Sequence, residues 1–103
     1  MKTGIELIAE ERQEQIEKHG RSIKSDVDIN PNGELCWAAS LLLHTPDQVS
    51  PMDIIAPTKL PNWNQDILLK MDGKQYKERL IIAGALIAAE IDRLQSLPTQ
   101  PHQ

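Results

Sequence analysis

The residues of this chain with the clearest chemical potential are carboxylates in or beside apolar segments. The stretch AEERQEQIEKHG carries Glu10, Glu11 and Glu14 in an EExxE arrangement, and NGELCWAAS carries Glu34. Asp26 lies between the two stretches. A carboxylate that is removed from water needs a cation or hydrogen-bond donors beside it. Mg²⁺ prefers oxygen ligands of this kind and usually keeps several of its water molecules.

The helical phase of residues 9–20 separates the glutamates of the EExxE arrangement. At about 100° per residue, Glu10 and Glu14 turn away from the apolar side of the helix, whereas Glu11 lies at its edge. We expect Glu10, Glu14 and Glu17 to be solvated, as most carboxylates on helices are. Glu11 borders the interior and is the stronger candidate for a ligand.

Glu34 and Asp26 each have two explanations that the residues alone leave open. Glu34 stands in the first turn of the most apolar segment, where a carboxylate either stabilises the positive end of the helix dipole or binds a cation shared with Glu11. Asp26 is either a turn-forming residue of the polar stretch 21–30 or a further ligand. The metal-site hypothesis therefore names Glu11, Glu34 and Asp26 as ligands of Mg²⁺.

Two further groups of charged residues have structural explanations. Glu90 and Asp92 are two residues apart in RLIIAGALIAAEIDRL, so they point about 200° apart on a helix and cannot face one site together. We expect both to mark the return to solvent, with Glu90 pairing with Arg93 or lying on the side of Arg79. His19, near a helix C-terminus, is expected to interact with the helix dipole.

The elements that must position these residues are predicted to be helices, which makes the fold all-α. Aromatic residues are scarce and Phe is absent, so the core must be built from Leu, Ile and Ala. Three main helices are predicted over residues 3–19, 31–44 and 74–97. Residues 21–30 are polar and aperiodic and are expected to form a loop. The segment 45–73 contains four prolines and is expected to be irregular or to hold short helical pieces.

Caps define the ends of the first two predicted helices. Thr3 and Glu6 have the spacing of a capping box, in which each side chain accepts a hydrogen bond from the other residue's backbone. Gly20 suits a helix C-terminus because it tolerates a positive φ. Asn30 followed by Pro31 is a favourable start for the second helix.

Length and composition indicate one domain over residues 1–97, followed by a frayed tail at 98–103. The net charge is −4 and no basic run is present, so binding to nucleic acid is not expected. The run Leu80 to Ala89 is too short to cross a bilayer, and acids come too early for a signal peptide. Cys36 is the single cysteine, which excludes an intrachain disulfide. We expect a soluble, cytoplasmic protein.

These motifs resemble the all-α nucleoside triphosphate pyrophosphohydrolase superfamily, which includes MazG-like and dimeric dUTPase proteins. That family carries EExxE on one helix and ExxD on the next, and the two motifs bind Mg²⁺, which clamps the phosphates of a nucleotide. Glu10, Glu11 and Glu14 match the first motif, and Glu34 matches the Glu of the second. Trp37 stands where the family has its Asp.

A second resemblance, to small phage and prophage proteins often labelled MazG-like, covers more of the chain. It implies a helical, oligomeric protein of phage or prophage origin. The stretches that carry it are ERQEQ (11–15), the acidic stretch at Asp26, NGELCWAA (32–39), the Pro/Trp segment near Trp63 and RLIIAGALIAAEIDRL (79–94).

Two functions of different classes follow from these observations. The first is Mg²⁺-dependent hydrolysis of a nucleoside triphosphate to the monophosphate and pyrophosphate. Glu11, Glu34 and Asp26 would then hold the metal, while Lys77 or Arg79 would contact phosphates. The second is a non-catalytic helical module that binds a nucleotide or a protein partner through the Pro/Trp segment. The tryptophan at the position of the family Asp favours the second function.

A surplus of apolar helix predicts a homodimer or a higher oligomer. The middle of 31–44 and the run Leu80 to Ala89 are apolar nearly all round. The alanines and Gly84 of the last helix would let another helix approach closely. An exposed stripe of this size invites association about a two-fold axis. The alternative is that apolar residues of 45–73 cover the stripe within one chain.

Overall fold

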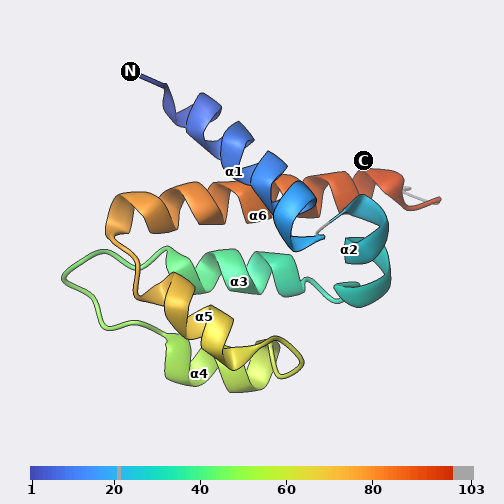
Figure 1. Ribbon diagram of the computed structural model, residues 1–103. Coiled ribbons are helices and arrows are strands. Elements are labelled where there is room, and N and C mark those ends of the chain that lie inside the picture. Colours follow the sequence, from blue (N-terminus) through green and yellow to red (C-terminus); the bar gives the residue numbers. More distant parts are fainter. Residues whose placement is uncertain (21, 99–103) are drawn as a thin grey trace.

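The computed structural model describes residues 1–20 and 22–98, and this part of the chain folds into six α-helices without a strand (Figure 1). The predicted all-α fold is confirmed. Most of the predicted tail, 99–103, lies outside the described residues. In chain order, the helices are α1 (Gly4–His19), α2 (Ile23–Ile29), α3 (Glu34–Leu42), α4 (Met52–Lys59), α5 (Gln65–Asp72) and α6 (Tyr76–Ser96).

The long helix α6 organises the fold. The helices α1, α2 and α3 all pack against it, whereas α4 packs against α3 and α5 (Figure 1). The apolar character of α6 on most of its sides accounts for this central place, because each neighbour buries a different stripe of it. The N-terminal half of α1 extends away from the rest of the molecule, as Figure 1 shows.

The core is aliphatic, as the scarcity of aromatic residues predicts. Leu and Ala side chains from α3 and α6 form its centre, and residues of α4 and α5 pack against them. Each fully buried leucine contributes roughly 1.5–3 kcal/mol relative to an exposed one. The largest apolar side chains with less than 2% exposure are Leu35, Leu41, Leu42, Leu60, Leu68 and Leu86.

Both predicted caps of α1 are confirmed. The hydroxyl of Thr3 accepts a hydrogen bond from the backbone N–H of Glu6 at 3.2 Å, and the Glu6 carboxylate accepts from the backbone N–H of Thr3 at 3.0 Å. Gly20 ends the helix in the left-handed region, with φ of 64°. The hydrogen bond from the Thr3 backbone lowers the pKa of the Glu6 carboxyl, and the hydrogen bond with the Thr3 side chain lowers it further.

The loop predicted at residues 21–30 is wrong, because Ile23–Ile29 form α2. The hydroxyl of Ser22 caps this helix by accepting from the backbone N–H of Ser25 at 3.1 Å. Its inward side carries Asp26 and Asn30, both buried, in place of apolar residues. A helix whose buried positions are polar leaves no apolar periodicity in the sequence, and this explains the error.

The other boundaries differ from the predicted ones by small amounts. The second predicted helix begins only at Glu34, because Gly33 at its N-terminus has φ of 79° and interrupts the helical backbone. The segment 45–73 holds the two short helices α4 and α5, as predicted. Among the described residues, none of the helices combines the length and hydropathy needed to cross a membrane.

Candidate functional site

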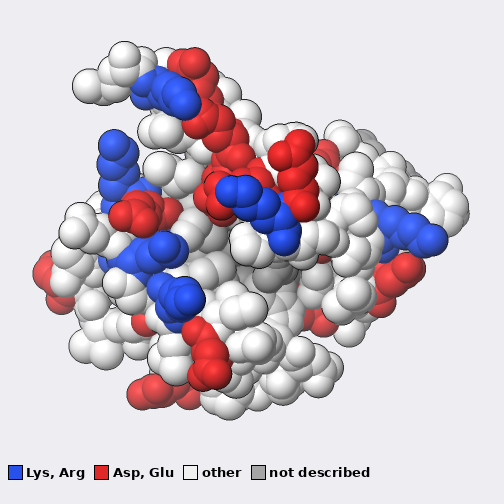
Figure 2. All heavy atoms as spheres, in the orientation of Figure 1, with Lys and Arg blue, Asp and Glu red and all other residues white. Residues whose placement is uncertain are grey.

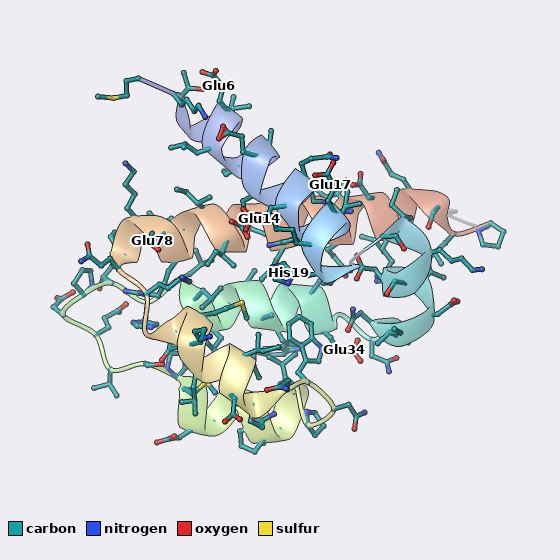
Figure 3. All side chains as sticks on the ribbon, in the orientation of Figure 1. Glu6, Glu14, Glu17, His19, Glu34 and Glu78 are labelled. Carbon is teal, nitrogen blue, oxygen red and sulfur yellow. The ribbon has the colours of Figure 1, made fainter. Side chains whose placement is uncertain are left out.

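The predicted metal ligands lie on three different helices. Glu11, on α1, accepts a hydrogen bond from the side-chain amide of Gln15 at 3.3 Å. Asp26, on α2, is fully buried. Glu34, in the first turn of α3, accepts from the backbone N–H of Asn32 at 2.7 Å, and Figure 3 places it beside α2. Each carboxylate therefore has a hydrogen-bond partner of its own or is engaged inside the protein.

A buried arginine near the end of α6 pairs with a glutamate of the same helix. Arg93 donates to both carboxylate oxygens of Glu90, at 2.6 and 3.0 Å, and this confirms the predicted Glu90–Arg93 pair. The expected return of Glu90 to solvent is wrong, since its side chain is only 16% exposed. The hydrogen bond to Glu90 is the main reason that the pKa of Arg93 is raised. The charges of Glu90, Glu34 and Asp26 raise it further, against the opposing effect of burial.

The binding of Mg²⁺ by Glu11, Glu34 and Asp26 stays a prediction. Among the residues that the structure describes, no three His, Cys, Asp or Glu side chains lie close enough to hold one metal ion. Asp26 Oδ1 accepts from the Asn30 amide at 3.0 Å, and Glu90 is engaged by Arg93. The position of the family Asp is taken by Trp37, whose ring lies 4.8 Å from the Lys59 ammonium.

The glutamates expected to be solvated are exposed. Glu10 pairs with Lys2, and the carboxylate of Glu14 lies 3.8 Å from the Lys18 ammonium one turn further along α1. Acidic side chains gather along α1 on the face that Figure 2 shows. Exposed pairs of this kind contribute little to stability, because water and salt screen them. The literal EExxE motif is therefore mostly a solvated face, as its helical phase predicts.

A pocket of about 220 Å³ lies where the end of α1, α2 and the start of α5 meet. The imidazole of His19 comes from α1, and Figure 3 shows it at the end of that helix. Asp26 and Asn30 line the pocket from α2, while Asn62 and Trp63 line it from the loop before α5. The pocket therefore combines one aromatic ring and two isoleucines with several polar groups, and it is smaller than the roughly 300–1,000 Å³ of most small-molecule sites.

A chain of hydrogen bonds runs through this pocket. The indole N–H of Trp63 donates to Asn30 Oδ1 at 3.0 Å, and Asn30 Nδ2 donates to Asp26 Oδ1 at 3.0 Å. Asn30 was not among the predicted site residues. The signal that indicates it is the spacing of Asp26 and Asn30, four residues apart and thus on one face of a helix. The partner Trp63, distant in the sequence, has no such signal.

The guanidinium of Arg79, which was expected to contact phosphates, is engaged inside the protein. Its side chain is buried and donates to the backbone carbonyls of Leu42 at 2.8 Å, His44 at 2.6 Å and Lys74 at 3.1 Å. The first two carbonyls belong to the end of α3 and the residues after it, where a helix leaves carbonyls without intrahelical donors. Arg79 therefore caps α3 from α6.

Lys77 is exposed, but it lies far from the predicted carboxylates within one chain. Along α6, the rise of 1.5 Å per residue separates Lys77 from Arg93 by roughly 24 Å. Lys77 instead borders an apolar groove of about 320 Å³ between the first halves of α1 and α6. Leu7, Ile8 and Leu80 are among the side chains that line this groove.

A second polar cluster joins the α3–α4 connection to α5. The imidazole of His44 lies 2.8 Å from Asp72 Oδ1, and the hydroxyl of Ser50 donates to Asp72 Oδ2 at 2.7 Å. The carboxylate stands between the imidazole and the hydroxyl, so the imidazole cannot accept the hydroxyl proton as in a nucleophilic relay. This cluster is structural.

Comparisons of the chain with known proteins found no relative whose site could be compared with this one. No protein-family model, curated protein or solved structure matches the chain. Function is therefore argued from the residues and their arrangement.

Proposed function

We propose that this chain is a helical nucleotide-binding module whose pocket between α2 and α5 receives the nucleobase. The observation that carries the proposal is the hydrogen-bond chain from Trp63 through Asn30 to Asp26. It holds an aromatic ring at the edge of a pocket that also presents polar groups. A nucleobase is a flat ring with donors and acceptors along its edges, so stacking and hydrogen bonds can be satisfied together.

The charge of the pocket favours the base over the phosphates as the buried part of the ligand. Its described lining contains the carboxylate of Asp26 and no Lys or Arg. The buried carboxylate of Asp26 behind the pocket wall repels a phosphate, and no described lining side chain offers one a permanent positive charge. The phosphates of a bound nucleotide would therefore lie at the open side of the pocket.

Thermal melting with added nucleotides tests the proposal. A ligand that binds only the native state at about 100 times its Kd adds about 2.7 kcal/mol of stability. We expect one or more of the common nucleotides to raise the melting temperature, and Trp63→Leu to abolish this rise. Trp37→Leu is the matched control, because it removes the other tryptophan. Equal responses in both variants would place the ligand elsewhere and contradict the proposal.

We propose MazG-like pyrophosphohydrolase activity on the bound nucleotide as the second candidate function. It is favoured because several of the sequence stretches that carry the resemblance interact with the last of them, residues 79–94. The side chain of Arg12 from the first stretch lies 3.4 Å from Asp92 of the last, and the charges of Asp26 and Glu34 raise the pKa of Arg93 in that last stretch. Nucleotide binding without turnover would support the nucleotide-binding function alone.

Release of pyrophosphate from nucleoside triphosphates, with and without Mg²⁺, separates the two candidates. If the chain hydrolyses a triphosphate, we expect Glu34→Gln to lower the rate at least about tenfold, as the loss of one metal ligand or its support commonly does. Glu10→Gln, on the solvated side of α1, is the control. Turnover that is unaffected by Glu34→Gln would contradict the assignment of this residue.

We also propose that a second copy of the chain covers the exposed apolar edge of α1 and α6. Ile87 and Ile91 are 44% and 50% exposed on one side of α6, and Ile5 of the extended half of α1 is 82% exposed. The groove lined by Leu7, Ile8 and Leu80 adds further apolar surface between α1 and α6. Exposed apolar surface of this kind is a common basis of two-fold association.

Light scattering at micromolar concentration tests the dimer. We expect a mass twice the 11.6 kDa of one chain, and a return to the single mass in Ile87→Glu, because a charge would be buried in the interface. Ile54→Glu, at an exposed position on α4, is the control and should leave the mass unchanged. A single-chain mass for the unaltered protein would overturn the proposal.

A further inference from the structure

We propose that His19 contacts the phosphate of a nucleotide bound in the pocket between α2 and α5, so that the pocket prefers nucleotides to free nucleosides. The preference should grow as the pH falls from about 8 to about 6.5, where an imidazole gains its charge. The inference rests on the proposed nucleotide binding and names the residue for the anionic end of the ligand. His19 is the last residue of α1 and lines the pocket (Figure 3).

His19 is the one side chain in the described pocket lining that can carry a positive charge. Asp26 is negative and fully buried, and the remaining lining residues are uncharged. A phosphate held at this pocket therefore meets a cationic side chain of the lining only through His19. Since an imidazole is charged over part of the physiological pH range only, the contact depends on pH.

The exposure of the lining residues puts His19 on the rim of the pocket, where the phosphates of a bound nucleotide are expected. Asn30 is only 4% exposed and Trp63 is half-buried, whereas His19 is exposed. With a volume of about 220 Å³, the pocket holds a base and little more, so the rest of the ligand must pass the rim. The other exposed side chains of the rim carry no charge, and they are Ile29, Asn62, Asn64 and Ile67.

The imidazole of His19 is free to make this contact. It forms no hydrogen bond and no ion pair with the part of the chain that the structure describes, whereas the imidazole of His44 lies 2.8 Å from Asp72. A charged imidazole donates through both ring nitrogens, and phosphate oxygens accept strongly from charged donors. The hydroxyl of Ser25, which also lines the pocket, adds a neutral donor.

The other charged groups on α1 and its neighbours are paired or lie outside the pocket lining. The pairs are Lys18 with Glu14 on α1, Arg12 with Asp92 between α1 and α6, and Glu90 with Arg93 on α6. The exposed charged residues that do not line the pocket are Glu17 of α1, Lys24 and Asp28 of α2, and Asp66 of α5. A change of affinity between about pH 6.5 and 8 is therefore assigned to His19, because a phosphate monoester takes up its own proton at about pH 6.

Calorimetric titration with pairs of nucleotides and nucleosides tests the inference. The probes are AMP, GMP, CMP and UMP, each compared with its free nucleoside at about pH 6.5 and about pH 8. For a nucleotide that binds, we expect the Kd to be about threefold lower at the lower pH, the size of an exposed ion pair that is partly formed. The Kd of the matching nucleoside should not depend on pH.

Two variants at position 19 separate the charge of the side chain from its hydrogen bonds. His19→Gln keeps a donor but no charge, and it should bind the nucleotide with the weaker Kd at both pH values. His19→Lys is charged at both pH values and should bind the nucleotide tightly at both. His44→Gln removes a histidine outside the pocket and is the control, so it should keep the pH dependence of the unaltered protein.

The outcomes distinguish a failure of this inference from a failure of nucleotide binding. Equal affinities for a nucleotide and its nucleoside at both pH values, or a pH dependence that survives His19→Gln, would overturn the role of His19 and leave the nucleotide-binding proposal intact. Absence of binding by every probe at millimolar concentration, with the protein folded, would contradict the nucleotide-binding proposal and this inference with it.

Discussion

Replacing Arg79 with methionine is expected to lower the free energy of unfolding by about 2–4 kcal/mol, because buried carbonyls then lose their donors. The guanidinium donates to the carbonyls of Leu42, His44 and Lys74, and methionine preserves much of its length but none of its N–H groups. In a domain of this size the change corresponds to a fall in melting temperature of roughly 10–25 °C. Circular dichroism at increasing temperature measures it directly.

The control for Arg79→Met lies two residues away on the same helix. Lys77→Met removes a positive charge from an exposed position and should change the stability by less than about 0.5 kcal/mol. Arg79→Lys should fall between the two, because an ammonium keeps the charge but cannot reach carbonyls in several directions at once. Equal stability of Arg79→Met and Lys77→Met would show that Arg79 is not a cap.

Replacing Gly84 with leucine is expected to displace α1 from α6 and to cost about 2 kcal/mol. A Cβ at position 84 would lie 2.6 Å from Cδ1 and 2.9 Å from Cγ1 of Ile8, so the Ile8 side chain must move aside or the two helices must separate. Overpacking of this kind typically costs about 1–3 kcal/mol. Leucine is the better helix former by up to about 1 kcal/mol, which offsets part of the loss.

A double substitution separates the contact from other effects of leucine at position 84. Ile8→Ala combined with Gly84→Leu moves the bulk from α1 to α6, and we expect it to recover part of the stability that Gly84→Leu loses. The two single variants and the double variant form a thermodynamic cycle measured by chemical denaturation. Strictly additive changes would mean that Ile8 and Gly84 do not contact each other.

Much of the fold could be predicted because its long helices carry apolar periodicity and clear caps. The run from Leu80 to Ala89 predicts α6, and the capping box at Thr3 fixes the start of α1. The close approach expected at Gly84 is present, but the helix that uses it is α1 of the same chain. A pattern of small residues predicts that a helix packs there, and it does not say which chain supplies the helix.

The candidate site could be predicted in part only, and the reason is physical. The placement of Asp26 and Glu34 indicates that these carboxylates need partners, which are Asn30 for Asp26 and the backbone N–H of Asn32 for Glu34. The charges of both carboxylates also raise the pKa of Arg93, which is distant in the sequence and has no spacing relation to either. The contact between Asn30 and Trp63 has no spacing signal either, since the packing of α2 against the loop before α5 brings the two side chains together.

The fluorescence of Trp63 tests the nucleotide-binding proposal most directly. The chain has two tryptophans, so Trp37→Phe leaves Trp63 as the only one and makes its emission a report from the pocket. We predict that titration with the nucleotide that stabilises the protein changes this emission in a saturable way, because a stacked base alters the surroundings of the indole. An Asn30→Ala variant on the same background should lose the response. Unchanged emission up to millimolar nucleotide, with the protein folded, would contradict the account.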